Sequence, residues 1–321
     1  MRYLLLLFIT VCSCTNNSLQ KTSISGYVYG TTYNIVYFSE EELQLKMQID
    51  SLFNVIDMSM STYNSNSLIT KINDNENIEL DNHFKFVFNV SKNIFNKTDG
   101  YFDPSIGPLV NSLNFGPKNY DLPQGNLKDL VGLDKFNIID NKLIRPFNSF
   151  IDFNAIAKGY SVDVISHFLS NNNIANYLVE VGGEIRSSGI NIDGNKNWRV
   201  GLDTPRFDGL QKDLYKIFDL KDRSMATSGV YRKFKIDSLG NKYAHIINPK
   251  TGYSSTTNIL SVTVISENCI EADAYATALQ LMSIDEIAIL ANKNSDISIF
   301  IIYYDDNNEM KDASFNNFPS I

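Results

Sequence analysis

Residues 152–171, DFNAIAKGYSVDVISHFLSN, give the clearest indication of the fold. An apolar side chain recurs at every fourth position from Ile156 to Phe168, and this spacing predicts a helix over Ala155–Asn171 with one buried face. The segment that follows, Tyr177–Val181, is rich in β-branched and aromatic residues and predicts a strand. The two elements together indicate a fold that mixes helices with sheet.

Patterns of the same two kinds recur along the rest of the chain, and neither an internal repeat nor a long linker interrupts them. The fold class that we expect is therefore α+β, as one compact unit with a smaller lobe around residues 50–130. Further strands are expected at Tyr27–Phe38, Trp198–Leu202, Tyr215–Leu220, Ile259–Ile265 and Ile299–Tyr304, and further helices at Glu40–Met58, His83–Thr98, Ile270–Met282 and Ile284–Asn292.

The overall composition is that of an ordinary globular protein. The chain has 321 residues, of which 43% are hydrophobic and 20% charged, and its formal net charge is -8. No basic surplus exists to neutralise a phosphate backbone, which argues against a nucleic-acid partner. An anionic small ligand remains compatible with this charge, because a metal ion, a helix N-terminus and a few lysines can hold it.

The N-terminal residues form a separate, short apolar leader. Arg2 supplies a positive start, and Tyr3–Val11 is almost wholly apolar but too short to span a bilayer. This predicts a signal peptide over residues 1–13. Ser13 before Cys14 resembles the bacterial lipobox, so we expect lipid attachment at Cys14. The alternative is a plain secretory signal whose cysteines are incidental.

The cysteine count agrees with export and lipidation. Once Cys12 is cleaved off and Cys14 carries a lipid, Cys269 is the single cysteine left, and it cannot form an internal disulfide. The polar stretch after the lipidated cysteine lacks any pattern. We therefore expect residues 14–25 to be a tether and residues 26–321 to be the folded domain.

Seven short segments carry more special residues than a core requires. Their order along the chain matters as much as their content. They are Met60–Tyr63 with Ser67 and Asn73, Gly100–Pro104 with Gly107–Asn111, Asp152–Tyr160 with Asp163, Val181–Glu184, Ala226–Gly229 with Tyr231, His245–Gly252, and Glu271–Thr277.

The last of these segments contains two candidate metal ligands. Asp273 and Thr277 are four residues apart on a predicted helix, so their side chains share one face. A carboxylate and a hydroxyl suit Mg²⁺, which takes few protein ligands. No cluster of histidines and cysteines exists to bind zinc. The alternative is an acidic helix start followed by an ordinary helical threonine.

The segment at residues 152–159 is a candidate anion site. Exposed amides at a helix start favour an anion, and Lys158 adds positive charge. Asp152 or Asn154 could equally cap the helix, and both functions can hold together. Gly182 and Gly183 could form a site wall or only a flexible strand exit. Thr227–Gly229 offers small donors for a phosphate, or a structural turn.

Taken in order, the seven segments resemble the ApbE family, the FAD:protein FMN transferases, over residues about 26 to 285. The resemblance implies phosphoryl transfer, with FAD as substrate and Mg²⁺ as cofactor. A Thr or Ser hydroxyl of an acceptor protein attacks the phosphorus on the FMN side of the pyrophosphate. AMP leaves, and FMN stays attached to the acceptor through a phosphoester.

The resemblance also implies roles for individual residues. Asp273 and Thr277 correspond to metal ligands, joined by the backbone carbonyl of Ala155. Asp152 and Lys158 correspond to positions that contact FAD.

Further matched positions concern the flavin and the proton. Tyr29, Tyr63 and Ile247 match positions that line the flavin. Phe115 is retained in a loop where the family typically has Trp-Gly-Phe and this chain has Leu113-Asn114-Phe115. His245 stands where the family keeps its histidine, and a neutral imidazole could take the proton of the acceptor hydroxyl. Asn248 stands where the family more often has Asp.

Two other functions remain open at this stage: FAD hydrolysis to FMN and AMP, and non-catalytic FAD binding by a lipoprotein. The family's acceptor motif, an Asp before a short Ser/Thr-Gly/Ser-Ala-Thr run, is not found in the chain. About 40 residues follow the predicted metal helix, too few for an appended acceptor domain of ordinary size. We therefore expect a separate acceptor protein, from an electron-transfer or respiratory complex. The expected location is the bacterial cell envelope, lipid-anchored to the inner membrane on its periplasmic side.

Overall fold

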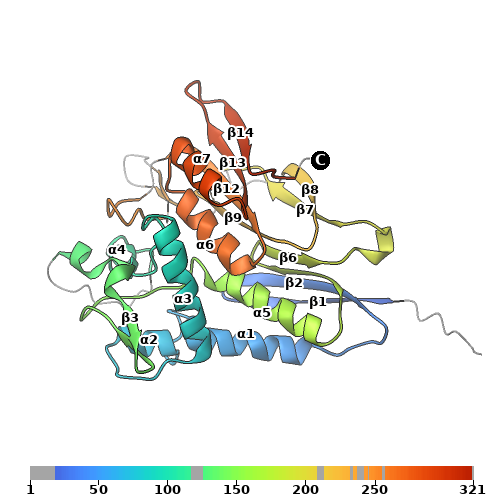
Figure 1. The fold of residues 1–321 in the computed structure, drawn as a ribbon, viewed down its shortest axis with the longest axis horizontal. Coiled ribbons are helices and arrows are strands. Elements are labelled where there is room, and N and C mark those ends of the chain that lie inside the picture. Colours follow the sequence, from blue (N-terminus) through green and yellow to red (C-terminus); the bar gives the residue numbers. More distant parts are fainter. Residues whose placement is uncertain are drawn as a thin grey trace, which may run out of the picture.

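An antiparallel sheet of eight strands runs through the structure, which is a computed structural model (Figure 1). The structure describes residues 19–116, 126–207, 213–231, 246–254 and 257–319, and only the backbone of 234–236 and 242–244. Every neighbouring pair of strands in the sheet is antiparallel. In spatial order the strands are β1 (Gln20–Val28), β2 (Thr31–Ser39), β5 (Asn176–Val181), β6 (Glu184–Ser188), β9 (Ser224–Gly229), β12 (Ile259–Ser266), β13 (Ser298–Tyr304) and β14 (Met310–Phe315).

Three long helices cover one face of this sheet. α1 (Lys46–Met60) and α5 (Ala157–Asn171) bury apolar side chains against β2 and β5, where Ile35 and Val179 are fully buried. α6 (Cys269–Leu279) packs on β9 and β12 and lies beside α5. Nine of the eleven residues of α6 are buried, because it has the sheet on one side and helices on the other.

A hairpin of two further strands covers part of the other face. β7 (Trp198–Asp203) and β8 (Leu214–Leu220) contribute Val200 and Phe218 to an apolar cluster with Leu260 and Phe300 of the main sheet. Because β12 has apolar clusters on both faces, all of its residues are buried. The remaining short elements here are η3 (Ile192–Gly194), β10 (Phe234–Ile236) and β11 (Lys242–Ala244).

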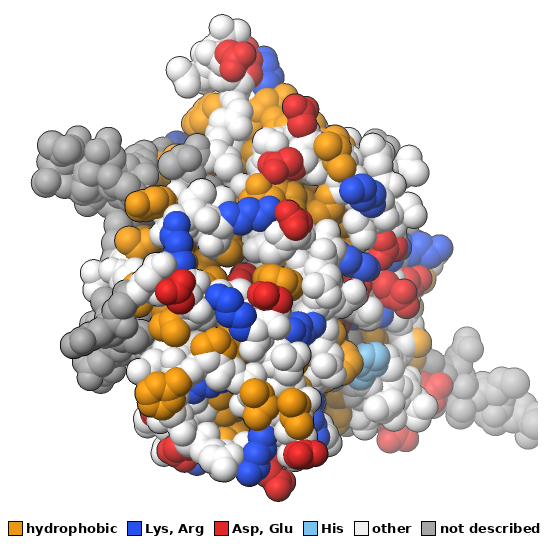
Figure 2. All heavy atoms as spheres, turned by 60° about the vertical axis from the view of Figure 1, so that its left-hand side comes forward, with side chains coloured by type: hydrophobic (Ala, Val, Ile, Leu, Met, Phe, Trp, Pro, Cys, Tyr) orange, Lys and Arg blue, Asp and Glu red, His pale blue; other side chains and the backbone are white. Residues whose placement is uncertain are grey.

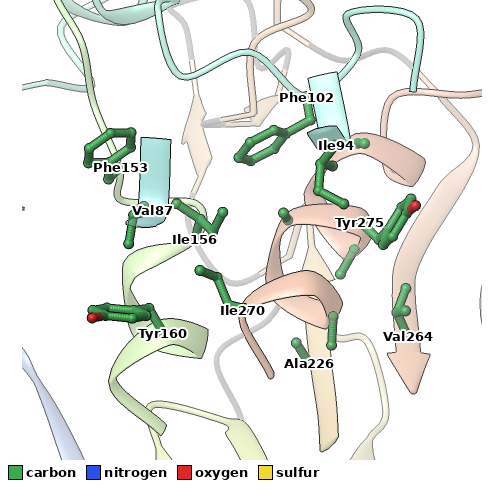
Figure 3. Close-up of a cluster of buried hydrophobic side chains, with 14 of the residues drawn as sticks. Val87, Ile94, Phe102, Phe153, Ile156, Tyr160, Ala226, Val264, Ile270 and Tyr275 are labelled. Atoms are coloured by element: carbon green, nitrogen blue, oxygen red, sulfur yellow. The ribbon is translucent and has the colours of Figure 1, made fainter. Parts of the chain in front are cut away.

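The smaller lobe, which lies at the lower left of Figure 1, comprises elements between residues 61 and 150. Its longest helix packs into the largest apolar cluster of the described residues. Val87 and Ile94 of its longest helix lie in the same apolar cluster as Ile270 and Tyr275 of α6 (Figure 3). The protein is therefore one α+β unit. The elements of the lobe are α2 (Leu68–Asn73), α3 (Asn82–Lys97), α4 (Gly107–Ser112), η1 (Leu127–Leu130), η2 (Leu133–Lys135), β3 (Asn137–Ile139) and β4 (Lys142–Ile144), and α7 (Ile284–Lys293) follows α6.

The surface on the side of this lobe carries positive and negative side chains interspersed among apolar ones, without a block of one sign (Figure 2). Within the residues that the structure describes, no helix is both long enough and apolar enough to cross a bilayer. The predicted leader over residues 1–13 and the lipidation site Cys14 lie outside the described residues.

The N-terminal part of the domain differs from the prediction. The expected strand at Tyr27–Phe38 is divided by a turn at Tyr29 and Gly30, whose φ angles are 51° and 75°. The first strand begins at Gln20, so the expected tether over residues 14–25 is wrong from residue 20 onward. β1 is an edge strand paired with β2 along its whole length, and its outward side chains are polar, which hid it from a hydrophobicity pattern.

The other predicted helices and strands are present, and most of their ends agree with the structure to within three residues. α5 begins at Ala157, two residues after its expected start, and α1 begins at Lys46 rather than Glu40. The prediction missed two central strands, β6 and β9. Thr227–Gly229, for which a turn was one alternative, is the end of β9, so that alternative is wrong.

Candidate functional site

The candidate site lies where the first turn of α5 crosses α6, and Gly159 allows the crossing. A Cβ at this position would lie 2.3 Å from the carbonyl oxygen of Cys269 and 2.8 Å from the Cβ of Asp273. Real Cβ contacts are not this short, so the two helix backbones can approach so closely only at a glycine. The glycine of the Lys158-Gly159 pair is thus explained by the packing of α5 on α6.

Asp273 is bound to the start of α5 at this crossing. Its Oδ2 accepts a hydrogen bond of 2.9 Å from the backbone amide of Gly159, and the residue is 4% exposed. In a regular α-helix the Gly159 amide would donate to the carbonyl of Ala155, four residues earlier. Here it donates to Asp273 of α6. The Asp273 carboxylate therefore lies against the turn of α5 that begins at Ala155, so two of the three predicted metal ligands, Asp273 and Ala155, come from neighbouring segments.

Thr277 lies one helical turn after Asp273, as its spacing predicts. Its Oγ1 is 3.3 Å from Oγ of Ser228, so the end of β9 reaches the same helix face. The sequence patterns had offered Ser228 only as a small donor, and the structure pairs it with Thr277.

The donor set fits magnesium in its chemistry. Asp273, Thr277 and the Ala155 carbonyl offer only hard oxygen donors, and Mg²⁺ takes few protein ligands and completes its shell with water and phosphate. In the described part of the chain, no group of three or more histidine, cysteine, aspartate or glutamate side chains could hold a metal.

Lys158 joins the site through two carboxylates. Its Nζ lies 2.7 Å from Oε1 of Glu184 and 3.8 Å from Oδ1 of Asp273, and its side chain is 30% exposed. Glu184 is 2% exposed and begins β6 directly after Gly182 and Gly183. The ammonium thus sits between two buried negative charges.

Glu184 is the site residue to which the sequence patterns assigned no role. The sequence did contain an indication of such a role, because an acidic residue directly follows the Gly182-Gly183 pair. The two glycines have φ angles of 62° and 102°, so they form a tight turn of left-handed backbone between β5 and β6. A Cβ on Gly182 would lie 2.8 Å from Cγ2 of Thr31, which places the β1–β2 turn beside this one.

Asp152 forms a local turn before α5. Its Oδ1 accepts from the backbone amide of Asn154 at 2.7 Å, and its Oδ2 accepts from the Asn154 side chain at 3.0 Å. The N-cap residue of α5 is Ile156, with no capping side chain, so the alternative that Asp152 or Asn154 caps the helix is wrong.

Tyr63 lies near this turn and is exposed. Partial desolvation of its ring and then the negative charge of Asp152 raise the pKa of Tyr63. Asn154 Nδ2 also lies 3.4 Å from Oγ1 of Thr62, which ties the turn to the segment that precedes α2. The structure therefore brings Asp152 and Tyr63 together.

Tyr29 is held at the β1–β2 turn, against α1. Its hydroxyl donates to the backbone carbonyl of Phe53 at 3.0 Å, and the two rings meet edge to face. Burial, and to a smaller extent the charge of Asp57, raises the pKa of Tyr29. The phenol is thus engaged with the protein, and its turn lies beside the one that precedes Glu184.

Phe115 and Ile247 belong to a small apolar cluster with Leu109 and Val131. These two predicted flavin positions, far apart in the sequence, are therefore neighbours. The Asn248 side-chain carbonyl accepts from the amide of Lys250 at 2.9 Å. An amide oxygen accepts this bond as a carboxylate would.

Lys250 joins the same loop to the segment of the smaller lobe that follows α3. Its Nζ lies 2.8 Å from Oδ2 of Asp99 and 3.9 Å from the centre of the Tyr101 ring. His245, the predicted base, lies outside the described residues. The structure therefore places Ile247, two residues later, but gives no contact for the imidazole.

Comparison with known proteins finds relatives over most of the chain. A model of the ApbE family matches residues 29–301. The FAD:protein FMN transferase of Vibrio cholerae serotype O1 is 32% identical over 316 residues, covering 94% of this chain and 93% of that protein. The solved structure of a flavin transferase ApbE from Vibrio cholerae superposes with a TM-score of 0.81 at 31% identity, covering 94% of this chain and 99% of that one. The apo flavinyl transferase ApbE of Pseudomonas stutzeri gives 0.80 at 25% identity, covering 92% and 95%.

Proposed function

Since this chain belongs to the ApbE family and is an FAD:protein FMN transferase, we propose that Mg²⁺ binds between α5 and α6 and that a separate protein accepts the FMN. The observation that carries the metal proposal is the hydrogen bond from the Gly159 amide to Asp273. It brings a buried carboxylate to the turn that also contains Ala155, and Thr277 lies on the same face of α6.

The residues of this site can hold the reacting pyrophosphate. Magnesium, when bound by Asp273, Thr277 and the Ala155 carbonyl, supplies charge stabilisation for the phosphate oxygens. Lys158 is partly exposed beside these groups and can offer its ammonium to the same oxygens. Tyr63 lies near Asp152, in the turn that precedes α5, and both are expected to contact FAD.

The transfer itself needs one proton acceptor. The hydroxyl oxygen of the acceptor protein attacks the phosphorus on the FMN side, the bond from that phosphorus to the bridging oxygen breaks, and AMP leaves. His245 takes the proton of the attacking hydroxyl. The enzyme forms no covalent bond to the substrate in this scheme. Most of the rate enhancement therefore comes from positioning of the reactants and from charge stabilisation by Lys158 and the metal ligands.

The function is tested by weighing enzyme and acceptor after incubation with FAD and Mg²⁺. We expect a candidate acceptor from a flavin-carrying electron-transfer complex to gain the mass of one FMN, with release of AMP. We expect the enzyme itself to gain nothing, because the family's acceptor motif is missing from its sequence. A stoichiometric FMN adduct on the enzyme would overturn the proposal of a separate acceptor. Free FMN and AMP without any adduct would indicate FAD hydrolysis instead.

We also propose that a lipid on Cys14 anchors the protein to the inner membrane, on its periplasmic side. The apolar run at Tyr3–Val11, followed by Ser13 and Cys14, supports this location. An enzyme and an acceptor that both face the periplasm at one membrane meet on the same surface.

Cys14→Ser should move the protein from the membrane fraction to the soluble fraction or leave it unprocessed. The measurement is fractionation of cells followed by mass spectrometry of the mature N-terminus. Cys12→Ser is the matched control, since the predicted cleavage removes that residue. A Cys14→Ser protein that is processed and anchored like the wild type would show that the lipobox assignment is wrong.

A further inference from the structure

The first turn of α6 is capped by a residue from another helix. Asp163 of α5 accepts the backbone amide of Cys269 on its Oδ1 and the backbone amide of Ile270 on its Oδ2, each at 2.9 Å. The N-cap residue of α6, Asn268, makes no capping bond with its side chain. The carboxylate of Asp163 therefore satisfies two of the amides that a helix start leaves unpaired.

The arrangement is reciprocal. The amide of Gly159, in the first turn of α5, donates to Asp273 of α6, while Asp163 of α5 accepts the first amides of α6. Each helix thus supplies the carboxylate that the first turn of the other requires. Two separate bonds, from Gly159 to Asp273 and from Cys269 and Ile270 to Asp163, therefore join the helices about one turn apart, where Gly159 packs against Cys269.

Asp163 is an expensive residue to use as a structural cap. It is 7% exposed, and burial raises its pKa to about 6 in spite of the two amide donors and Arg186, whose Nη1 lies 3.8 Å from Oδ1. Asn268, at the N-cap, is of a residue type that commonly caps helices without burying a charge, yet its side chain makes no capping bond, and the buried carboxylate of Asp163 takes that place. What the buried carboxylate adds is a fixed position of α6 relative to α5.

We propose that Asp163 is a positioning residue for the metal site: it holds α6 against α5 so that Asp273 and Thr277 stay in register with the carbonyl of Ala155. This inference rests on the proposed magnesium site. The three donors come from both sides of the helix crossing, so a small slide of α6 along α5 separates them. Ile156 and Ile270 lie in the apolar cluster at the crossing (Figure 3). Apolar packing of this kind opposes separation of the two helices, but because it is non-directional it does not fix their position along their axes.

The test is the affinity of the full-length chain for Mg²⁺, measured by calorimetry with FAD present and no acceptor. Asp163→Asn keeps one acceptor oxygen but loses the second, along with the charge. We expect the dissociation constant for Mg²⁺ to rise roughly ten-fold, the lower end of what loss of a ligand-orienting partner costs. Ser283→Ala is the matched control, because it removes the N-cap bond of α7, a helix that carries no site residue. It should lower the melting temperature and leave Mg²⁺ affinity unchanged.

An Asp163→Asn protein with a lower melting temperature and unchanged Mg²⁺ affinity would overturn the inference, since Asp163 would then be a cap only. If instead the proposed magnesium site is wrong, Asp273→Asn, which alters a proposed ligand, would also bind Mg²⁺ with wild-type affinity. That result differs from the one in which only the role of Asp163 is wrong. If Asp163→Asn does not fold, amide hydrogen exchange of the wild type decides. Addition of Mg²⁺ should slow exchange at Gly159, Cys269 and Ile270 more than in the first turn of α7, and an equal response in both places would refute the coupling.

Discussion

Asp273→Asn should lower magnesium-dependent FMN transfer on the order of 10³-fold, because loss of a metal ligand removes several kcal/mol of charge stabilisation from the transition state. The substitution keeps the shape of the side chain and an oxygen that can accept the Gly159 amide. The helix crossing should therefore survive, and the loss should be one of chemistry and not of folding. The measurement is the rate of transfer to an acceptor protein as a function of Mg²⁺ concentration.

Glu271→Gln is the control for Asp273→Asn. Glu271 lies on the same helix, two residues earlier, and is only partly buried, so the substitution makes the same chemical change outside the site. Its transfer rate should stay within about two-fold of wild type, as surface substitutions usually have small effects. Full activity of Asp273→Asn at every Mg²⁺ concentration would remove the metal assignment.

His245→Ala should lower the transfer rate by roughly 10²–10⁴-fold, the usual contribution of a positioned proton acceptor. FAD affinity should change far less, because the base acts on the hydroxyl of the acceptor and not on FAD. A rate measured at saturating FAD, together with FAD binding followed by fluorescence, separates the two effects.

The comparison for His245→Ala is His167→Ala, which removes an exposed histidine from α5. That variant should transfer FMN at the wild-type rate. If His245→Ala instead lost FAD binding while the bound complex reacted at an unchanged rate, His245 would be a binding residue and the base would have to be another group.

Local sequence patterns predicted the two helices that cross at the site, α5 and α6, but not β6 and β9. The four-residue spacing in α5 and the placement of Asp273 and Thr277 on one helix face depend on residues a few positions apart, and the structure has both features. The order of the seven segments predicted the family, which the comparisons confirm.

Features that depend on pairing between distant segments were not predictable in this way. β1 is recognisable as a strand only once β2 is paired with it, and Ser228 is adjacent to Thr277 only because β9 and α6 pack together. The bond from the Gly159 amide to Asp273 joins residues 114 positions apart. The sequence contained each partner, but their contact is a property of the tertiary fold.

If Cys14 carries the proposed lipid, the position at which β1 begins would limit how far the enzyme could search for its acceptor. Five residues separate Cys14 from Gln20, so a lipid on Cys14 would hold the sheet edge within about 20 Å of the bilayer, the reach of a fully extended chain of that length. A connecting segment this short would confine the domain to a thin layer above the membrane. Acceptors embedded in the same membrane would then meet the enzyme at a high effective concentration, whereas soluble proteins of the same compartment would not.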